Sequence, residues 1–245
     1  MVKITINSLA KTLVSIAVFS VVTVASYAAF VPHVAAEEFR SIFNGKDLSG
    51  WKGDTTRWSV KDGVITGTTT KEKPLPHNQF LIWDGIVSDF EFKAEFRLIG
   101  ENNSGVQYRS QTIEGAGDFR IKGYQADIHA KPLYTGMLYD EGGRGIVAQR
   151  GQRVVVNDKG DKDVVAKTDA VVKEDLTKWN TIEIRAVGNR LVHSINGKVT
   201  VDITDQDTKN QEFKGLLALQ IHAGKPMVIQ FRNLMLRDVS KSGTR

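Results

Sequence analysis

Three short segments of the sequence carry polar side chains at every second position: Gln107 and Arg109, then Gln125, Asp127 and His129, and finally Gln220 and His222. A carboxylate and an imidazole held in one place can exchange protons with a substrate, and amides and a guanidinium can bind oxygen atoms. If the three segments lie side by side, these groups form one polar surface. The residue types therefore indicate a site for ligand binding or for acid–base chemistry.

The alternation itself identifies the elements that hold these side chains. A period of two is typical of a half-buried β-strand, because successive side chains point to opposite faces of a sheet. The clearest strand is 90–98, where apolar residues alternate with a charged row from Glu91 to Arg97 that we assign to solvent. In segments 105–110 and 124–129, the same alternation predicts a row that faces the core: Val106, Tyr108, Tyr124, Ala126 and Ile128.

The rest of the chain predicts an all-β protein. Asp62-Gly63 and Asn196-Gly197 are strong hairpin signals, and a change of phase near Asn233 predicts a β-bulge. Segment 133–146 is rich in glycine and predicts a strand end followed by an exposed loop, while 173–178 predicts one helical turn. Many short strands without a convincing helix are typical of an antiparallel β-sandwich, here a single domain over residues 37–245.

Residues 1–36 have the pattern of a signal peptide. Lys3 and Lys11 accompany a long apolar run, 13–30, and Val34-Ala35-Ala36 supplies small residues for cleavage. This pattern predicts a periplasmic or secreted protein. The apolar run is close to the length of a membrane span, so an uncleaved anchor is the alternative.

Composition narrows the expected partners. The chain has 33 Lys and Arg against 28 Asp and Glu, and no basic run with interleaved aromatic residues. We therefore expect no nucleic-acid partner and no membrane contact beyond the signal sequence. The absence of cysteine excludes a disulfide, a thiolate metal site and a cysteine nucleophile.

Six motifs occur in order along the chain, at 39–51 (ending in SIFNGKDLSGW), 58–67 (WSVKDGVITG), 89–110, 123–128 (GYQADI), 178–198 and 215–236. Together they resemble the 3-keto-disaccharide hydrolase domain family, formerly a domain of unknown function. The resemblance covers nearly all of residues 37–245. It implies a concanavalin A-like jelly-roll β-sandwich, export from a bacterial cell, and an enzyme that hydrolyses the glycosidic bond of 3-keto-glucosides, 3-keto-disaccharides or related sugars.

The implied activity gives the candidate residues roles. A glycosidase ordinarily uses two carboxyl groups about 5–9.5 Å apart. In a 3-keto sugar the ketone acidifies the proton on carbon 2, so cleavage can proceed by elimination and then hydration. This route needs a base, a donor to the developing enolate, and an acid for the leaving oxygen. The catalytic candidates are Asp127 or His129 as base, Arg109 or Arg144 as donor and Glu141 as acid.

A sugar also needs hydrogen-bonding side chains and an aromatic platform. We predict that the carbohydrate substrate contacts six further residues on or near the polar surface: Gln107, Tyr108, Gln125, Tyr139, Gln220 and His222.

Other interpretations of the same residues stay open. His129 and His222 also fit ordinary sheet positions, and with Asp127 they could hold a divalent metal, although we expect no cofactor. Arg144 lies between glycines and fits a plain turn as well as a site. A non-catalytic, lectin-like carbohydrate-binding module could use the same surface with no acid or base.

Overall fold

A computed structural model of the chain describes residues 38–117, 119–170 and 173–239. The predicted signal peptide, 1–36, lies outside these residues. Within the described ranges the chain forms two β-sheets and one short 3₁₀ helix, η1 (Pro132–Tyr134). No helix in the same ranges is long and apolar enough to cross a membrane.

The larger sheet has ten strands in the described part of the chain. Their spatial order is β12 (Lys162–Lys167), β11 (Gln152–Val156), β15 (Lys198–Asp205), β14 (Arg190–Ile195), β13 (Asn180–Val187), β6 (Phe90–Gly100), β17 (Met227–Asp238), β4 (Val64–Thr69) and β3 (Trp58–Lys61), and β1 (Arg40–Ser41) pairs with β17. Neighbouring strands are antiparallel except β11 and β15, which are parallel. The sandwich is thus antiparallel, as the sequence predicts, except at this one pair.

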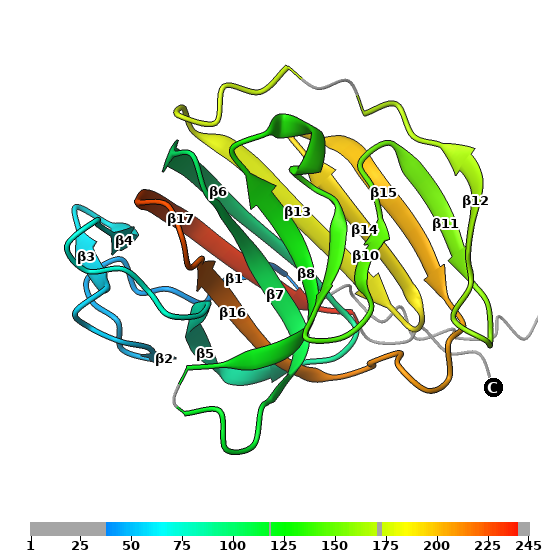
Figure 1. Cartoon of the computed structure of the whole chain (residues 1–245), viewed down its shortest axis with the longest axis horizontal. Coiled ribbons are helices and arrows are strands. Elements are labelled where there is room, and N and C mark those ends of the chain that lie inside the picture. Colours follow the sequence, from blue (N-terminus) through cyan, green and yellow to red (C-terminus); the bar gives the residue numbers. More distant parts are fainter. Residues whose placement is uncertain (1–37, 118, 171–172, 240–245) are drawn as a thin grey trace, which may run out of the picture. The chain divides into compact units, whose positions relative to one another are not determined.

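The smaller sheet has seven strands within the described ranges, and it positions the candidate site. Figure 1 shows β8 (Ile121–His129) of this sheet in front of β13 of the larger one. The spatial order is β10 (Gly145–Ala148), β9 (Leu138–Glu141), β8 (Ile121–His129), β7 (Asn103–Thr112), β16 (Gly215–Ile221), β5 (Gln79–Val87) and β2 (Trp51–Lys52).

Local sequence explains the hairpins. Asp62 and Gly63 join β3 to β4 with φ of 52° and 74°, and Asn196 and Gly197 join β14 to β15 with φ of 50° and 74°. Asn, Asp and Gly tolerate this left-handed region, which the tight hairpin turn requires. Asn233, with φ of 52°, marks the predicted bulge, because the register of β17 against β6 shifts there. These three predictions are confirmed.

Two segments differ from the sequence prediction. The stretch predicted as a strand end and an exposed loop, 133–146, instead holds η1, β9 and the start of β10, with Gly142 and Gly143 in the turn between the two strands. The stretch 173–178 forms a turn at its end and no helix. In the first case, pairing of β9 with β8 overrides the high local glycine content.

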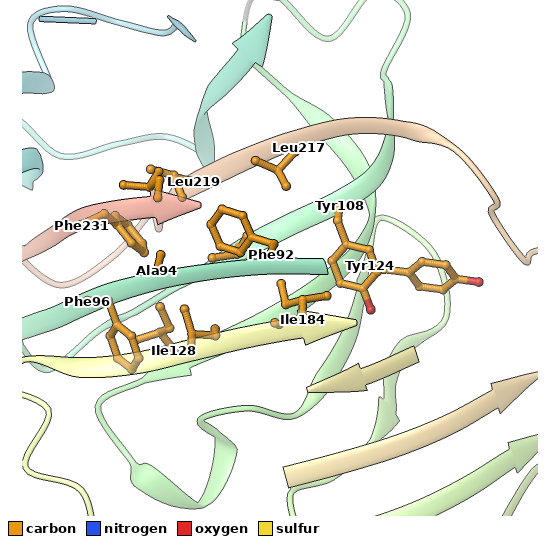
Figure 2. Close-up of a cluster of buried hydrophobic side chains, with 14 of the residues drawn as sticks. Phe92, Ala94, Phe96, Tyr108, Tyr124, Ile128, Ile184, Leu217, Leu219 and Phe231 are labelled. Atoms are coloured by element: carbon orange, nitrogen blue, oxygen red, sulfur yellow. The ribbon is translucent and has the colours of Figure 1, made fainter. Parts of the chain in front are cut away.

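The core lies between the two sheets. Figure 2 shows Phe92, Phe96, Ile184 and Phe231 of the larger sheet pointing into the same space as Leu217, Leu219 and Ile128 of the smaller one. All of these side chains are buried, as the alternation of β6 and of 124–129 predicts. Burial of this apolar area is the main driving force that holds the two sheets together.

Polar contacts also join the two sheets across this core, and one of them involves a histidine. The hydroxyl of Tyr108 on β7 lies 2.8 Å from Nε2 of His193 on β14, and both residues are fully buried. Burial lowers the pKa of His193 to about 4, although nearby backbone groups of Gly136 and Met137 act in the opposite direction. The folded protein therefore holds His193 neutral.

This depressed pKa predicts a pH-dependent cost to folding. The pKa of His193 in the folded state lies below its unfolded value of 6.5. Above pH 6.5 the buried ring therefore costs no stability, and the free energy of unfolding decreases as the pH falls from 6.5 toward 4. We expect His193→Gln to gain about 3 kcal/mol relative to the wild type across this window. Urea unfolding of both proteins at pH 7, 5.5 and 4 measures the difference. A difference that does not change with pH would contradict the assignment.

Candidate active site

Part of the predicted polar surface, with Gln125, Asp127, His129 and His222, lies on the outer face of the smaller sheet. It contains a pocket of about 310 Å³. Its walls come from strands β7 to β10, from η1 and the segment that follows it, and from the segments beside β5 and β16. The lining residues are Asn78, Asn103, Gln125, Asp127, His129, Tyr134, Met137, Tyr139, Glu141, Ile146 and His222. The structure therefore brings together six predicted site residues: Gln125, Asp127, His129, Tyr139, Glu141 and His222.

Asp127 lies in the wall of this pocket with only 1% of its surface exposed. Burial raises the pKa of its carboxyl group to about 7, the hydrogen bond from Gln125 opposes the shift, and the nearby charge of Glu141 adds to it. Gln125 Nε2 donates to Asp127 Oδ1 at 2.6 Å. A carboxylate that takes up a proton near neutral pH is suited to act as a general base.

His129 has its tautomer fixed by a backbone contact. The N–H of Lys131 donates to Nδ1 of His129 at 2.9 Å, so the neutral ring carries its proton on Nε2. Burial lowers the pKa of His129, and Lys131 and His222 lower it further. At neutral pH His129 is therefore an uncharged donor.

His222 has the opposite tautomer. Its Nδ1 lies 2.5 Å from the carbonyl oxygen of Ala223, which can only accept, so the proton of the neutral ring is on Nδ1 and Nε2 carries the lone pair. The two histidines that line the pocket thus differ in hydrogen-bonding character.

Glu141 is held by a residue that sequence patterns did not identify. Asn78 Nδ2 donates to Glu141 Oε1 at 2.9 Å, and Asn78 Oδ1 accepts from the N–H of Ala223 at 3.0 Å. The register of β9 against β8 pairs Glu141 with Gly123, four residues from Asp127. At about 3.3 Å per residue, the two acids are about 13 Å apart along the strand direction at Cα, which leaves room for a sugar ring between their side chains.

Buried amides surround Asp127. Gln107 and Gln220 are fully buried and Gln125 is 1% exposed. In the described part of the chain, several of their atoms and one of Asn103 have no hydrogen-bond partner: Gln107 Nε2 and Oε1, Gln125 Oε1, Gln220 Nε2 and Asn103 Oδ1. A buried polar atom without a partner costs about 1–3 kcal/mol. Of these residues Gln125 and Asn103 line the pocket, where a ligand would supply the missing bonds, whereas Gln107 and Gln220, both predicted to contact substrate, do not line it.

Arg109 does not lie on this face, and its predicted catalytic role is not supported. It has φ of 48° at a point where the register of β7 against β8 shifts, so the alternation fails there. Its fully buried guanidinium instead donates to the carbonyls of Ser88, Gly188 and Glu212 and to the carboxylate of Asp89. Arg109 therefore links separate segments of the chain through buried hydrogen bonds.

Arg144 also lies outside the pocket, which corrects its predicted role. Its guanidinium pairs with Asp140 at 2.8 Å, Asp205 at 2.8 Å and Asp207 at 3.3 Å. Burial alone would lower the pKa of Arg144, but the hydrogen bonds to Asp205 and Asp140 raise it above its ordinary value. Arg144 is the cation of a buried ion cluster. Likewise Tyr108 packs in the core, and the prediction that it contacts substrate is wrong.

Five pocket residues are not among the predicted site residues: Asn78, Asn103, Tyr134, Met137 and Ile146. Asn103 shares the parity of Gln107 on β7, so the alternation could have identified it. Asn78 precedes β5 in a loop with no periodicity and gave no such signal. Among the described residues, no three His, Asp or Glu side chains are grouped as a metal site would require.

This β-sandwich with a polar pocket on one sheet matches a known class of domain. Residues 38–237 match the 3-keto-alpha-glucoside-1,2-lyase-like domain, and the chain belongs to this family. A curated relative, the 3-keto-disaccharide hydrolase of Bacteroides thetaiotaomicron, is 29% identical over 87 residues, which are 33% of this chain and 30% of that protein. The match thus spans less than a third of the relative's length.

Solved structures share the fold. A candidate glycosyl hydrolase of Parabacteroides distasonis superposes with a TM-score of 0.56 at 18% identity, over 83% of this chain and 100% of the other. The carbohydrate-binding module CBM66 of Bacillus subtilis gives 0.52 at 16% identity, over 77% and 96%. These likenesses confirm the predicted jelly-roll sandwich.

Proposed function

We propose that the protein is an exported enzyme that cleaves the glycosidic bond of 3-keto-glucosides, with Asp127 as the base. The observation that carries this proposal is a buried carboxyl with a pKa of about 7, set in a pocket with a second carboxyl and unpaired amides. Family membership supports the chemical class of the substrate.

The first step is removal of the proton on carbon 2 of the sugar. Asp127 takes this proton, and the electron pair of the C–H bond moves toward carbon 3, whose ketone oxygen becomes an enolate. The donors that line the pocket are neutral: Nε2–H of His129 and the side-chain amides of Asn103 and Gln125. Such fixed dipoles stabilise a developing negative charge in a site of low polarity. They take the role that the sequence suggested for Arg109 or Arg144.

The second step breaks the bond to the leaving group. The enolate returns its electron pair, a double bond forms between carbons 1 and 2, and the bond from carbon 1 to the leaving oxygen breaks. Glu141, held by Asn78, gives a proton to this oxygen. Water then adds to carbon 1 and a proton returns to carbon 2, so the net reaction is hydrolysis.

A binding module is the second candidate function. The unpaired amides and the ring of Tyr139 would serve sugar binding without any reaction, and CBM66 has the same fold. Binding alone gives no reason for a buried carboxyl whose pKa is near 7, since burial of a charged group is costly. This cost favours catalysis.

Incubation of the purified protein with 3-keto-glucosides and with the matching unoxidised glucosides tests the proposal. We expect release of the leaving group from the 3-keto compounds only. Parallel reactions with a chelator show whether a divalent metal takes part. Binding without release would refute the enzyme and support the binding module. Export is tested separately, by mass spectrometry of the mature amino terminus in the native host, where we expect cleavage after residue 36.

Asn78 gives a test of the positioning of Glu141. Asn78→Ala removes the donor that holds Oε1, so we expect kcat to fall about 5-fold with a smaller change in KM, since one hydrogen bond is worth about 1 kcal/mol. Asn189→Ala, in the turn between β13 and β14 of the other sheet, is the matched control. Equal kcat values for the two variants would exclude a positioning role for Asn78.

A further inference from the structure

A second pocket adjoins the first on the same face of the smaller sheet. It has a volume of about 310 Å³ and shares Asn78, Glu141 and His222 with the first pocket. The segments that precede β5 and β8 add His77 and Arg120. Because Glu141 lines both pockets, the proposed acid for the leaving oxygen lies at their boundary. A group that is released from a sugar in the first pocket is therefore received by the second.

Polar side chains dominate the second pocket. Imidazole, amide, guanidinium and carboxyl groups line it: His77, Asn78, Arg120, Glu141 and His222. Phe80 and Ile121 also line it, but each is only 1% exposed, so they form little of its surface. The hydroxyl groups of a sugar need such donors and acceptors when they leave water. The lining therefore favours a second sugar as the leaving group.

Arg120 adds a requirement for charge. Its side chain is half-buried and, among the residues that the structure describes, forms no hydrogen bond or ion pair. Every other arginine in the described ranges has at least one such partner. An unpaired guanidinium offers a planar fork of N–H donors, which matches the two oxygens of a carboxylate. Arg120 is therefore suited to bind an acidic group of the ligand.

The chemistry of bond cleavage supports the same assignment. Glu141 has to be protonated to give a proton to the leaving oxygen, and it then carries no charge. Apart from the two histidines, Arg120 is then the one charged side chain among the described residues that line this pocket. An anion bound to Arg120 balances this charge. It also opposes the tendency of a cation to keep a carboxyl group in the same pocket ionised.

We propose that the second pocket binds a sugar acid as the leaving group, that is, a second sugar that carries a carboxylate. The proposal rests on the proposed function, because it places the bond to be broken at Glu141, between the two pockets. The 3-keto sugar lies against Asp127. The hydroxyls of the leaving sugar face His77 and Asn78, and its carboxylate pairs with Arg120.

The test compares three 3-keto-disaccharides of the same linkage, in which the leaving sugar is glucuronate, its uncharged amide or glucose. We expect the wild type to have a kcat/KM about 10-fold higher with glucuronate than with either neutral sugar, because hydrogen bonds between charged groups are the stronger ones. In Arg120→Gln this ratio should fall to about 1, since glutamine brings no charge to the carboxylate. Lys122→Gln removes an exposed cation of β8 that lines neither pocket, and should keep the wild-type ratio.

A wild type that does not prefer glucuronate, or an Arg120→Gln protein that keeps the preference, would overturn the proposal. Failure of all three substrates would instead contradict the proposed function. In that case titration calorimetry with the same disaccharides still tests the pocket. We expect the wild type and Lys122→Gln to bind the glucuronate compound about 10-fold more tightly than Arg120→Gln does. Equal affinity in the three proteins would refute the site.

Discussion

Replacement of Asp127 by asparagine should remove catalysis and, at the same time, make the protein more stable at pH 7. Removal of a general base lowers kcat by about 10²–10⁴-fold. Asparagine keeps the Oδ1 acceptor for Gln125, so the geometry of the pocket should persist. The two effects together separate the loss of a base from the loss of the fold.

The gain in stability follows from the pKa of Asp127. The pKa of Asp127 rises from 3.8 to about 7 on folding, so the folded state binds the proton more tightly than the unfolded state. The contribution of Asp127 to the free energy of unfolding therefore decreases as the pH rises from about 4 to 7. Asparagine carries no charge to bury. We expect it to gain about 2–4 kcal/mol at pH 7 and almost nothing at pH 4.

Thermal unfolding and turnover at pH 4, 5.5 and 7 measure both effects. Asp163→Asn, on the exposed strand β12, is the control and should change neither quantity. In the wild type, kcat/KM should rise with pH through about 7 as Asp127 loses its proton. An Asp127→Asn protein that keeps more than a tenth of the turnover, or that is less stable than the wild type at pH 7, would contradict the assignment.

Asp127 and His193 act in opposite directions over the same pH range. Acidification from 7 to 4 favours the fold through Asp127 and disfavours it through His193. These contributions oppose one another in the wild type, so each is seen only by comparison of a variant with the wild type.

The second large effect is expected at Arg144. Arg144→Met leaves Asp140, Asp205 and Asp207 without their shared cation, and the three carboxylates are 9%, 1% and 2% exposed. Removal of one partner from a buried ion pair costs about 3–5 kcal/mol, because the remaining charge is uncompensated. We therefore expect a loss of at least this size.

Arg153→Met is a matched control, since Arg153 pairs with Asp202 at 3.0 Å but is 53% exposed. An exposed pair contributes about 0–1 kcal/mol, so this variant should unfold nearly as the wild type does. Urea unfolding gives both values. If Arg144→Met were as stable as the wild type but inactive, Arg144 would belong to the catalytic machinery, as its place between glycines first suggested.

The strands and hairpins were predictable because they depend on local pattern. The alternation from Phe90 to Leu98 and the Asp62-Gly63 and Asn196-Gly197 turns each specify a conformation within a few residues. The same parity placed Gln125, Asp127 and His129 on one face. It failed at Arg109, because one residue of positive φ reverses every later side chain on the strand.

The other site residues depend on contacts that are distant in sequence. Arg144 lies outside the site because Asp205 and Asp207, about sixty residues further along, neutralise it. Asn78 enters the site because its loop meets both Ala223 and Glu141. Hydrophobic periodicity carries no information on either contact, since both join polar groups at strand ends and in loops or turns.

The most direct test of the account follows the proton on carbon 2. A 3-keto-glucoside is incubated with the protein in deuterated water, and the released sugar is analysed by NMR at early times against a reaction without protein. Removal of this proton by Asp127, followed by hydration, predicts deuterium at carbon 2 of the product, with neither release nor exchange in Asp127→Asn. Release of a sugar that keeps its hydrogen at carbon 2, or no release by the wild type, would contradict the account.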